Sequence, residues 1–358
     1  MKRGEIPLIH ISGSHREMGR QMGEACRKQV AHSIKNSREL LEDARDTIQL
    51  TWKLAAIQAR KYIPFAEEIY PQYVEELKGI AEGANVSYDD LVVLNAMEAV
   101  TNDALHLTKC TSMGVTQQNT ANGHVLLAHN EDWVPEDEAD IYLVHARPDD
   151  EPPFLAMTYG GLLPNIGFNA FGIAQLCDTV YPNDSRIGIP RIINSRAVLG
   201  SRTPSEAMRH MLAPHRAAGY NYLLAHDSGE IYNVEVSAHH FAILYDVEGY
   251  MVHTNHYLDY QMVQIESESD ELISTRVRYH RALRLLKQSS QHNITTLQAI
   301  QRDHVNFPDS ICNHSEIGDP LDREKTIMGL IIDLTSRQMH AVWGNPCENN
   351  YSTYQLED

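Results

Sequence analysis

Residues 108–133 read TKCTSMGVTQQNTANGHVLLAHNEDW, and this stretch decides the fold that the sequence predicts. Cys110 opens a run of alternating apolar residues, which is the pattern of a β-strand. Asn122 and Gly123 form the dipeptide most typical of a two-residue type I′ turn, so a second strand should fold back against the first. The polar residues 129–133 then return to the end of the hairpin at which the cysteine lies. The stretch therefore predicts a thiol with polar neighbours at the open end of a β-hairpin.

Three other short motifs accompany the Cys-Thr-Ser start, and their order and spacing along the chain matter together. Asn130 and Asp132 are separated by one residue in the second run, TNH occupies residues 254–256, and GNPC follows the last predicted hairpin at residues 344–347. Together with the Cys-Thr-Ser start, they resemble the acyl-coenzyme A:6-aminopenicillanic acid acyltransferase family of N-terminal-nucleophile (Ntn) hydrolases, peptidase family C45. The resemblance covers nearly the whole chain.

The resemblance implies a precursor that cuts itself between Lys109 and Cys110. Residues 1–109 would then be a mainly helical fragment that stays associated with the catalytic fragment, residues 110–358, in one structural domain. A strained backbone would let the thiol attack the Lys109 carbonyl, and hydrolysis of the resulting ester-type bond would free an α-amino group. With an ordinary pKa of about 7.7–8.0, that amine is a general base suited to neutral pH. Nucleophile and base would then share one residue.

The resemblance also assigns roles to other residues. Asn255 lies at the place of a family asparagine whose amide stabilises the oxyanion, and Asp132 and Arg323 would orient the site. Thr111 and Asn130 are expected to support it.

Two observations limit this assignment. The motif SICNH at residues 310–314 departs from the family's Ser-x-Cys-Arg-His, because Asn313 replaces the arginine, and this puts the substrate pocket in doubt. Taken alone, Cys110 also fits a buried strand cysteine with no function, since free cysteine is among the most buried residue types.

Periodicity elsewhere predicts helices as far as about residue 100 and mainly short strands after Cys110. Helices are expected near residues 190–199 and 203–212, and hairpins over residues 221–236 and 326–343. Combined with the resemblance, this order implies an α+β fold of four layers, αββα, in which two mostly antiparallel sheets lie between helical layers.

Composition excludes several classes of protein. Among the 358 residues, no apolar run reaches the ~18–20 residues of a membrane span. The opening residues are too polar and too few for a signal peptide, so we expect a cytoplasmic protein with no membrane partner. The five cysteines are odd in number, far apart and without a CxxC pair. We therefore expect no disulfide framework, no thiolate zinc site or other metal, and no cofactor.

The net charge of −18 argues against nucleic acid as a partner, because phosphate binding needs a basic face. Residues 1–109 carry 14 basic and 16 acidic side chains, so the remaining residues hold an excess of 16 negative charges. Nine carboxylates fall within residues 131–151 and four within residues 266–271. Most are interpreted as a solvated surface. Any that line the site would favour cationic substrates and disfavour coenzyme A.

The sequence thus predicts an enzyme that acts on small-molecule N-acyl amides through a Cys110 thioester. Water as acceptor gives an amidohydrolase, and an amine acceptor with a thioester donor gives an acyl-coenzyme A-dependent N-acyltransferase. Other classes stay open: a papain-like enzyme, although no papain-type sequence surrounds Cys110; a metallohydrolase, although the 19 histidines form no HExxH motif; and a non-catalytic binding protein. A homo-oligomer is also open.

Overall fold

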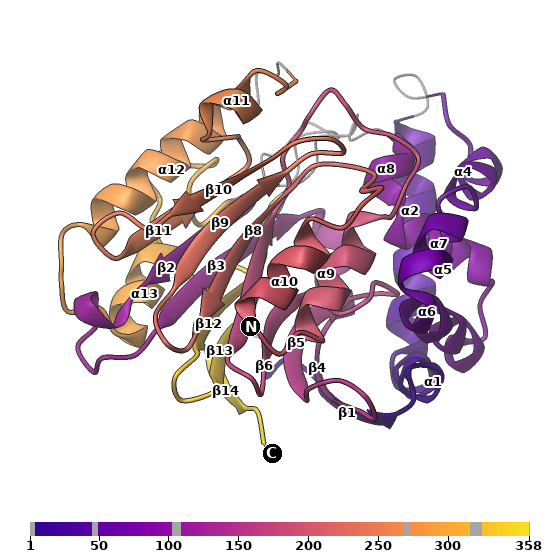
Figure 1. Ribbon diagram of the computed structural model, residues 1–358, viewed down its shortest axis with the longest axis horizontal. Helices are drawn as coiled ribbons and strands as arrows, with labels where there is room; N and C mark the ends of the chain where they lie inside the picture. The colour runs from indigo at the N-terminus through magenta and orange to yellow at the C-terminus, as the bar shows by residue number, and fades with distance from the viewer. Residues whose placement is uncertain (1–3, 45–48, 102–108, 268–271, 316–323, 358) are drawn as a thin grey trace.

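A computed structural model describes residues 4–44, 49–101, 109–267, 272–315 and 324–357. Two β-sheets lie face to face at the centre, with helices outside both of them (Figure 1). The space between the sheets is filled by a core to which both contribute, including Leu127 and Leu330 from one sheet and Leu155 and Leu223 from the other. The four-layer αββα fold expected from the sequence is therefore confirmed.

Strand order places the nucleophile region at the centre of the smaller sheet. The eight-stranded sheet has the order β1-β4-β5-β6-β7-β8-β9-β10, and the six-stranded sheet has the order β11-β2-β3-β12-β13-β14. Neighbouring strands are antiparallel except β1 and β4, which are parallel. The strands are β1 (Leu8–Gly13), β2 (Thr111–Val115), β3 (Leu126–Trp133), β4 (Ile141–Pro148), β5 (Phe154–Tyr159), β6 (Ile166–Asn169), β7 (Ile173–Asp178), β8 (Tyr220–His226), β9 (Ile231–Val236), β10 (Phe241–Tyr245), β11 (Tyr250–His253), β12 (Lys325–Asp333), β13 (Gln338–Trp343) and β14 (Ser352–Gln355).

Helices form the two outer layers. Those before the proposed cut are α1 (His15–Ala25), α2 (Arg27–Asp43), α4 (Trp52–Ala59), α5 (Ile63–Ile69), α6 (Pro71–Ala84), α7 (Tyr88–Asn95) and α8 (Met97–Thr101). Those after it are η1 (Gln117–Asn119), η2 (Pro135–Asp140), α9 (Arg191–Leu199), α10 (Pro204–Met211), α11 (Tyr260–Val263), α12 (Leu272–Leu286) and α13 (Ile294–Gln301). α12 and α13 contact the six-stranded sheet, whereas α1, α2, α9 and α10 contact the eight-stranded one. None of the helices in the described part of the chain combines the length and apolar character needed to cross a membrane.

β2 and β3 pair antiparallel as predicted, but the tight turn predicted between them was wrong. Their connection runs over residues 116–125 and includes η1. Gly123 has a positive φ of 73°, whereas Asn122 does not share the left-handed conformation that a type I′ turn requires at both positions. The backbone N–H of Ala121 instead donates to the carbonyl oxygen of His292 at 2.8 Å. The connection is thus held by the loop before α13.

Residues on the two sides of Lys109 share one core. β1 pairs with β4 along its whole length and so forms an edge of the larger sheet. Arg196 on α9 and Glu76 on α6 are both fully buried, and their Nη2 and Oε2 atoms lie 3.0 Å apart. Removing one partner of a buried ion pair typically costs about 3–5 kcal/mol, because the other charge is left uncompensated. This pair therefore links the N-terminal helices firmly to the rest.

α1 and α6 approach each other closely because glycines line their contact. A Cβ atom added to Gly19 would lie 2.0 Å from the carbonyl oxygen of Glu76. One added to Gly79 would lie 2.2 Å from the carbonyl oxygen of Arg16. Both distances fall far inside van der Waals contact with rigid backbone, so any larger residue would force the helices apart.

Gly79→Ala should therefore lower the free energy of unfolding by about 1–3 kcal/mol, the usual cost of overpacking. This is expected although alanine is the better helix former by about 1 kcal/mol. Urea unfolding measures the difference. Gly4→Ala is the matched control, because a Cβ there meets no atom within 4 Å. A Gly79→Ala protein as stable as the wild type would show that the helices can separate without cost.

Candidate active site

Cys110 lies immediately before β2, and only 1% of its surface is exposed. The β2–β3 register places Ser112 opposite His129, so the polar run does return beside the thiol as predicted. The Cys110 thiol donates a hydrogen bond to Glu131 Oε2 at 3.8 Å. Burial first, and then the negative charges of Glu131 and Asp178, raise the pKa of the thiol well above its ordinary value. The thiol therefore needs a base before it can act as a nucleophile.

Asn255 contacts the backbone of the candidate nucleophile. It lies just beyond the end of β11, and its Oδ1 accepts a hydrogen bond from the Cys110 backbone N–H at 2.7 Å. Its Nδ2 donates to the carbonyl oxygen of Thr179 at 3.0 Å. The side-chain oxygen of Asn255 thus faces Cys110, and its NH2 group faces Thr179. The structure brings Asn255 to the site, and its role as an oxyanion donor stays a prediction.

Arg278 on α12 is the residue that the sequence analysis missed. Its side chain is buried, and its guanidinium donates to the carbonyl oxygen of Cys110, to Thr111 Oγ1 at 3.0 Å and to Asn255 Oδ1 at 2.9 Å. Helical spacing in the sequence could have identified Arg278 as buried. The buried face of α12 consists of Thr275, Arg278, Ala282 and Leu286. An arginine at three- and four-residue intervals from small and apolar residues lies on the buried side of its helix.

Asp132 supports the site from β3. It is fully buried, and its Oδ1 accepts a hydrogen bond from Thr326 Oγ1 at 2.6 Å. Burial raises the pKa of Asp132 well above its ordinary value, although the positive charge of Arg278 opposes this. A hydrogen bond from the Asp132 backbone to Cys110 favours the thiolate. Asp132 therefore contacts the nucleophile through its backbone and Thr326 through its carboxyl group.

The other predicted residues have different surroundings. Thr111 contacts Arg278 and so belongs to the site. Asn130 points to the helical layer, where its Nδ2 donates to the carbonyl oxygens of Gln301 and Ile311 at 3.0 and 2.7 Å. It holds β3 against that layer. Arg323 lies outside the described residues.

Lys109, on the other side of the predicted cut, is held by acidic groups. Its Nζ lies 3.1 Å from Asp309 Oδ1 and 3.5 Å from Glu324 Oε2. Its backbone N–H donates to the carbonyl oxygen of Asp132 at 3.4 Å. The residues on both sides of the candidate scissile bond are thus fixed by named contacts.

A buried chain of polar groups extends from the thiol between the sheets. Glu131 Oε2 lies 2.9 Å from His129 Nε2, and His129 Nδ1 lies 2.9 Å from Ser112 Oγ. Ser112 donates to Asp178 Oδ1 at 2.8 Å, and Asp178 Oδ2 lies 3.4 Å from His253 Nδ1. The groups that surround the nucleophile are thereby coupled to a histidine at the end of β11.

His253 should make stability depend on pH. Burial, the largest influence, lowers its pKa, but the hydrogen bonds and charges of Asp178 and Glu235 together outweigh burial and raise the pKa to about 9. A raised pKa contributes stability that is fully present below the unfolded value of about 6.5 and is lost as the pH rises through about 9. The free energy of unfolding of the wild type relative to His253→Gln should therefore fall by up to about 3 kcal/mol between pH 6 and pH 10.

Urea titrations of both proteins at several pH values measure this difference. His280→Gln, which changes an exposed histidine on α12, is the control and should show no such trend. A difference between wild type and His253→Gln that stays constant from pH 6 to pH 10 would contradict the assignment of a protonated, buried His253.

A small pocket borders the thiol. Its volume is about 20 Å³, which is room for a water molecule. Glu98 and Glu131 supply carboxylates to its wall, and the rest includes apolar and aromatic side chains, among them Met157, Leu162, Ile166, Ile192, Tyr159 and Tyr220. Arg191 pairs with Glu98 at 2.6 Å between Nη2 and Oε1. The pocket thus combines an apolar wall with two carboxylates.

The interpretation of residues 131–151 as a solvated acidic surface was wrong for five of the nine carboxylates, which are buried: Glu131, Asp132, Asp137, Glu138 and Asp140. They have partners from other elements, such as Lys325, whose Nζ lies 2.7 Å from Glu138 Oε2. In the second acidic cluster, residues 268–271 lie outside the described residues. These five carboxyl groups therefore belong to the interior of the fold and not to a solvated acidic surface.

The four-layer fold with a buried cysteine at the start of a central strand defines the class, that of Ntn-type acyltransferases and amidohydrolases. Within this class, the family model described as acyl-coenzyme A:6-aminopenicillanic acid acyl-transferase matches residues 118–348. The chain belongs to this family, and the resemblance recognised in the sequence is confirmed.

Two relatives are similar to this chain over most of their length. The chain is 23% identical over 344 residues to the 40 kDa form of acyl-coenzyme A:6-aminopenicillanic-acid-acyltransferase from Emericella nidulans, covering 95% of this chain and 93% of that protein. It is 26% identical over 261 residues to the β-alanyl-dopamine/carcinine hydrolase of Drosophila melanogaster, covering 66% of each.

Two solved structures are similar in part. Penicillin V acylase from Agrobacterium tumefaciens has a TM-score of 0.47 at 15% identity, over 65% of this chain and 82% of that one. A conjugated bile acid hydrolase from Clostridium perfringens has a TM-score of 0.45 at 11% identity, over 69% of this chain and 97% of that one.

Proposed function

We propose that this protein is a self-processing amidohydrolase that acts on small N-acyl amides through a thioester at Cys110. The observation that carries the proposal is the hydrogen bond of 2.7 Å from the Cys110 backbone nitrogen to Asn255 Oδ1, in a buried site that also holds the thiol. A cut before Cys110 turns this N–H into an α-amine beside its own thiol. Asn255 is then in position to orient the amine.

In the proposed maturation step, the Cys110 sulfur bonds to the carbonyl carbon of Lys109. The bond from that carbon to the Cys110 nitrogen breaks, and the thiol proton goes to the departing nitrogen. Water then hydrolyses the thioester and leaves a carboxylate on Lys109 and a free amine on Cys110. The contacts of Lys109 with Asp309 and Glu324, and of Cys110 with Arg278, support this step because they fix both sides of the bond.

The two products, residues 1–109 and 110–358, are proposed to stay together. The pairing of β1 with β4 and the buried ion pair between Glu76 and Arg196 both join the two parts. A protein cut at this place therefore keeps its core.

In the proposed catalytic cycle, the α-amine takes the proton of the thiol. The guanidinium of Arg278, which also donates to Asn255 Oδ1, disfavours the protonated amine by charge repulsion and so keeps it available as a base. The thiolate attacks the substrate carbonyl, the amine product leaves with the proton, and water hydrolyses the thioester.

Asn255 Nδ2 is the proposed oxyanion donor. It donates one hydrogen to the carbonyl oxygen of Thr179, which lines the pocket, and an amide nitrogen carries a second hydrogen. Asp132 and Arg323 are proposed to orient the site. A cytoplasmic location, the absence of a cofactor and a possible homo-oligomer stay predictions.

The proposed substrate is a small acylated amine. The side chains beside the thiol are largely apolar and suit an acyl chain, although the pocket of about 20 Å³ must widen to admit one. The carboxylates of Glu98 and Glu131 disfavour the phosphates of coenzyme A. The fly relative is named for hydrolysis of acylated amines, and the fungal relative for transfer from acyl-coenzyme A. We expect hydrolysis to dominate here.

The test compares kcat/KM for an N-acyl amine with kcat/KM for the coenzyme A thioester of the same acyl chain, with and without an acceptor amine. The acylated amine should be turned over at least tenfold faster, which corresponds to about 1.4 kcal/mol in transition-state binding. Faster turnover of the thioester in the presence of an acceptor amine would establish the acyltransferase instead. Turnover of neither compound by fully cut protein would contradict both.

A further inference from the structure

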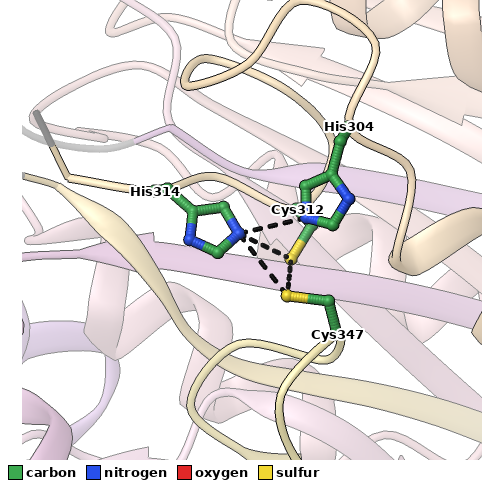
Figure 2. Close-up of side chains that lie close together, drawn as sticks. All are labelled: His304, Cys312, His314 and Cys347. Carbon is green, nitrogen blue, oxygen red and sulfur yellow. Dashed lines mark hydrogen bonds between the residues drawn. The ribbon is translucent and has the colours of Figure 1, made fainter.

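Two cysteines and two histidines meet at one point away from the thiol of Cys110. His304 follows α13, Cys312 and His314 lie in the segment before β12, and Cys347 follows β13. Figure 2 shows their side chains directed toward one another. One ligand atom from each residue lies within 4.8 Å of the others. We refer to these four residues as the Cys/His cluster.

Four separations between ligand atoms of the Cys/His cluster are close to those of a tetrahedral metal site, and all lie within 4.8 Å. Zinc lies about 2.3 Å from sulfur and about 2.0–2.1 Å from nitrogen, so tetrahedral geometry places two sulfurs about 3.8 Å apart, sulfur and nitrogen about 3.5 Å apart and two nitrogens about 3.3 Å apart. The observed separations are 3.5 Å between Cys312 Sγ and Cys347 Sγ, and 3.1 Å between the Nε2 atoms of His304 and His314. His314 Nε2 lies 3.6 Å from Cys312 Sγ and 3.5 Å from Cys347 Sγ.

We propose that the Cys/His cluster binds one zinc ion in a structural site. Two thiolates and two imidazoles in a tetrahedral arrangement select zinc among the common divalent metals. Four protein ligands fill the coordination sphere and leave no open position, which distinguishes a structural zinc from a catalytic one.

The surroundings of the cluster fit this assignment. Asn345 Nδ2 donates to Cys312 Sγ at 3.6 Å, the kind of contact that stabilises a metal-bound thiolate. Cys312 is buried, whereas Cys347 and His304 are exposed and give the ion a route from solvent.

The ion would fasten a segment that reaches the candidate active site. Asn313 lies between two ligands, and its backbone N–H donates to Thr326 Oγ1 at 2.9 Å. The Thr326 backbone N–H donates back to the carbonyl oxygen of Asn313 at 3.0 Å, and Thr326 Oγ1 donates to Asp132 at 2.6 Å. The zinc would therefore help to position Asp132, because Asn313, between the two ligands, contacts Thr326, and Thr326 contacts Asp132.

The cysteine pattern of the sequence argued against a thiolate zinc site, because no CxxC pair is present. The fold supplies the site differently, since it brings together two cysteines that are 35 positions apart in the chain. Two connections supply the ligands: His304, Cys312 and His314 lie between α13 and β12, and Cys347 lies between β13 and β14. Their meeting depends on how α13, β12 and β13 pack.

The experiment is elemental analysis of the full-length protein, purified with a reductant and without chelator. About one equivalent of zinc per chain is expected, and Cys347→Ser and His314→Ala should each lower it to below about 0.1 equivalent. Cys26→Ser, which changes a buried cysteine outside the cluster, should keep the metal. Cys110→Ala should keep it too, so the result does not depend on the proposed catalytic function.

A second readout uses the wild type alone and does not require any variant to fold. The exposed Cys347 should resist a thiol reagent and become reactive when a strong chelator is added. Cobalt(II) in place of zinc should give the absorption bands of a tetrahedral site with thiolate ligands.

Several results would overturn the proposal. Only trace zinc after reconstitution under reducing conditions, zinc retained by both ligand variants, or immediate labelling of Cys347 in untreated protein would each do so. A Cys312–Cys347 disulfide in freshly purified protein, or a different metal in the cluster, would also replace the assignment.

Discussion

A Cys110→Ala variant should run as one full-length chain on a denaturing gel, whereas the wild type should give two pieces, residues 1–109 and 110–358. The variant lacks the sulfur that attacks the Lys109 carbonyl, and no other group on the Cys110 side of the bond can replace it. Amide hydrolysis should fall to the uncatalysed background, because the nucleophile and, without the cut, the α-amine are both missing. Gel electrophoresis and the intact masses of the fragments measure the cut.

Cys26→Ala is the matched control for this experiment. Its sulfur is also fully buried but lies in the helical layer between α1 and α2. This variant should be cut and active like the wild type. Cleavage of Cys110→Ala at the same bond, or full activity of an uncut wild type, would contradict the Ntn mechanism.

Arg278→Lys should produce the second largest loss. A lysine carries the same charge, but a single ammonium cannot reproduce the planar fork that contacts the Cys110 carbonyl, Thr111 and Asn255 together. We expect kcat/KM to fall by roughly 10²–10³-fold, comparable to the loss of one donor at a reacting centre. The rate of self-cleavage should fall as well, so processed protein must be isolated before its kinetics are measured.

The control lies on the same helix. Arg276 is two positions away, and its side chain is 54% exposed and pairs loosely with Glu266. Arg276→Lys should leave both rates unchanged. If Arg278→Lys processes and hydrolyses amides at the wild-type rate, Arg278 has a structural role only.

Local patterns in the sequence predicted the elements of the fold well. The alternation after Cys110 gave β2 and β3, and the residues expected in helices near 190–199 and 203–212 and in a hairpin over 221–236 form them. The turn at Asn122 and Gly123 was wrong because a distant loop at His292 holds the connection open. A dipeptide preference of this kind is weak compared with tertiary contacts.

Only those residues of the candidate site that belong to a family motif could be predicted from the sequence. Cys110, Asn255 and Asp132 do meet, but Arg278 has no motif, and its position follows from the way α12 lies on the smaller sheet. The ligands of the Cys/His cluster lie in two connections that are separated by a β-hairpin, so no spacing rule covers it. Burial of five carboxylates in residues 131–151 likewise depends on partners such as Lys325, far along the chain.

If Cys110 cuts the chain as proposed, its contacts also set the earliest moment at which it can react in a cell. Asn255 and Arg278, which hold its backbone, are synthesised 145 and 168 positions later. At translation rates of roughly 5–20 residues per second, the ribosome needs on the order of 10–30 s after Cys110 to supply them. Under the proposed mechanism, a growing chain would carry Lys109 and Cys110 joined and unreactive until most of the protein has been made, which would prevent release of the first fragment from an unfinished polypeptide.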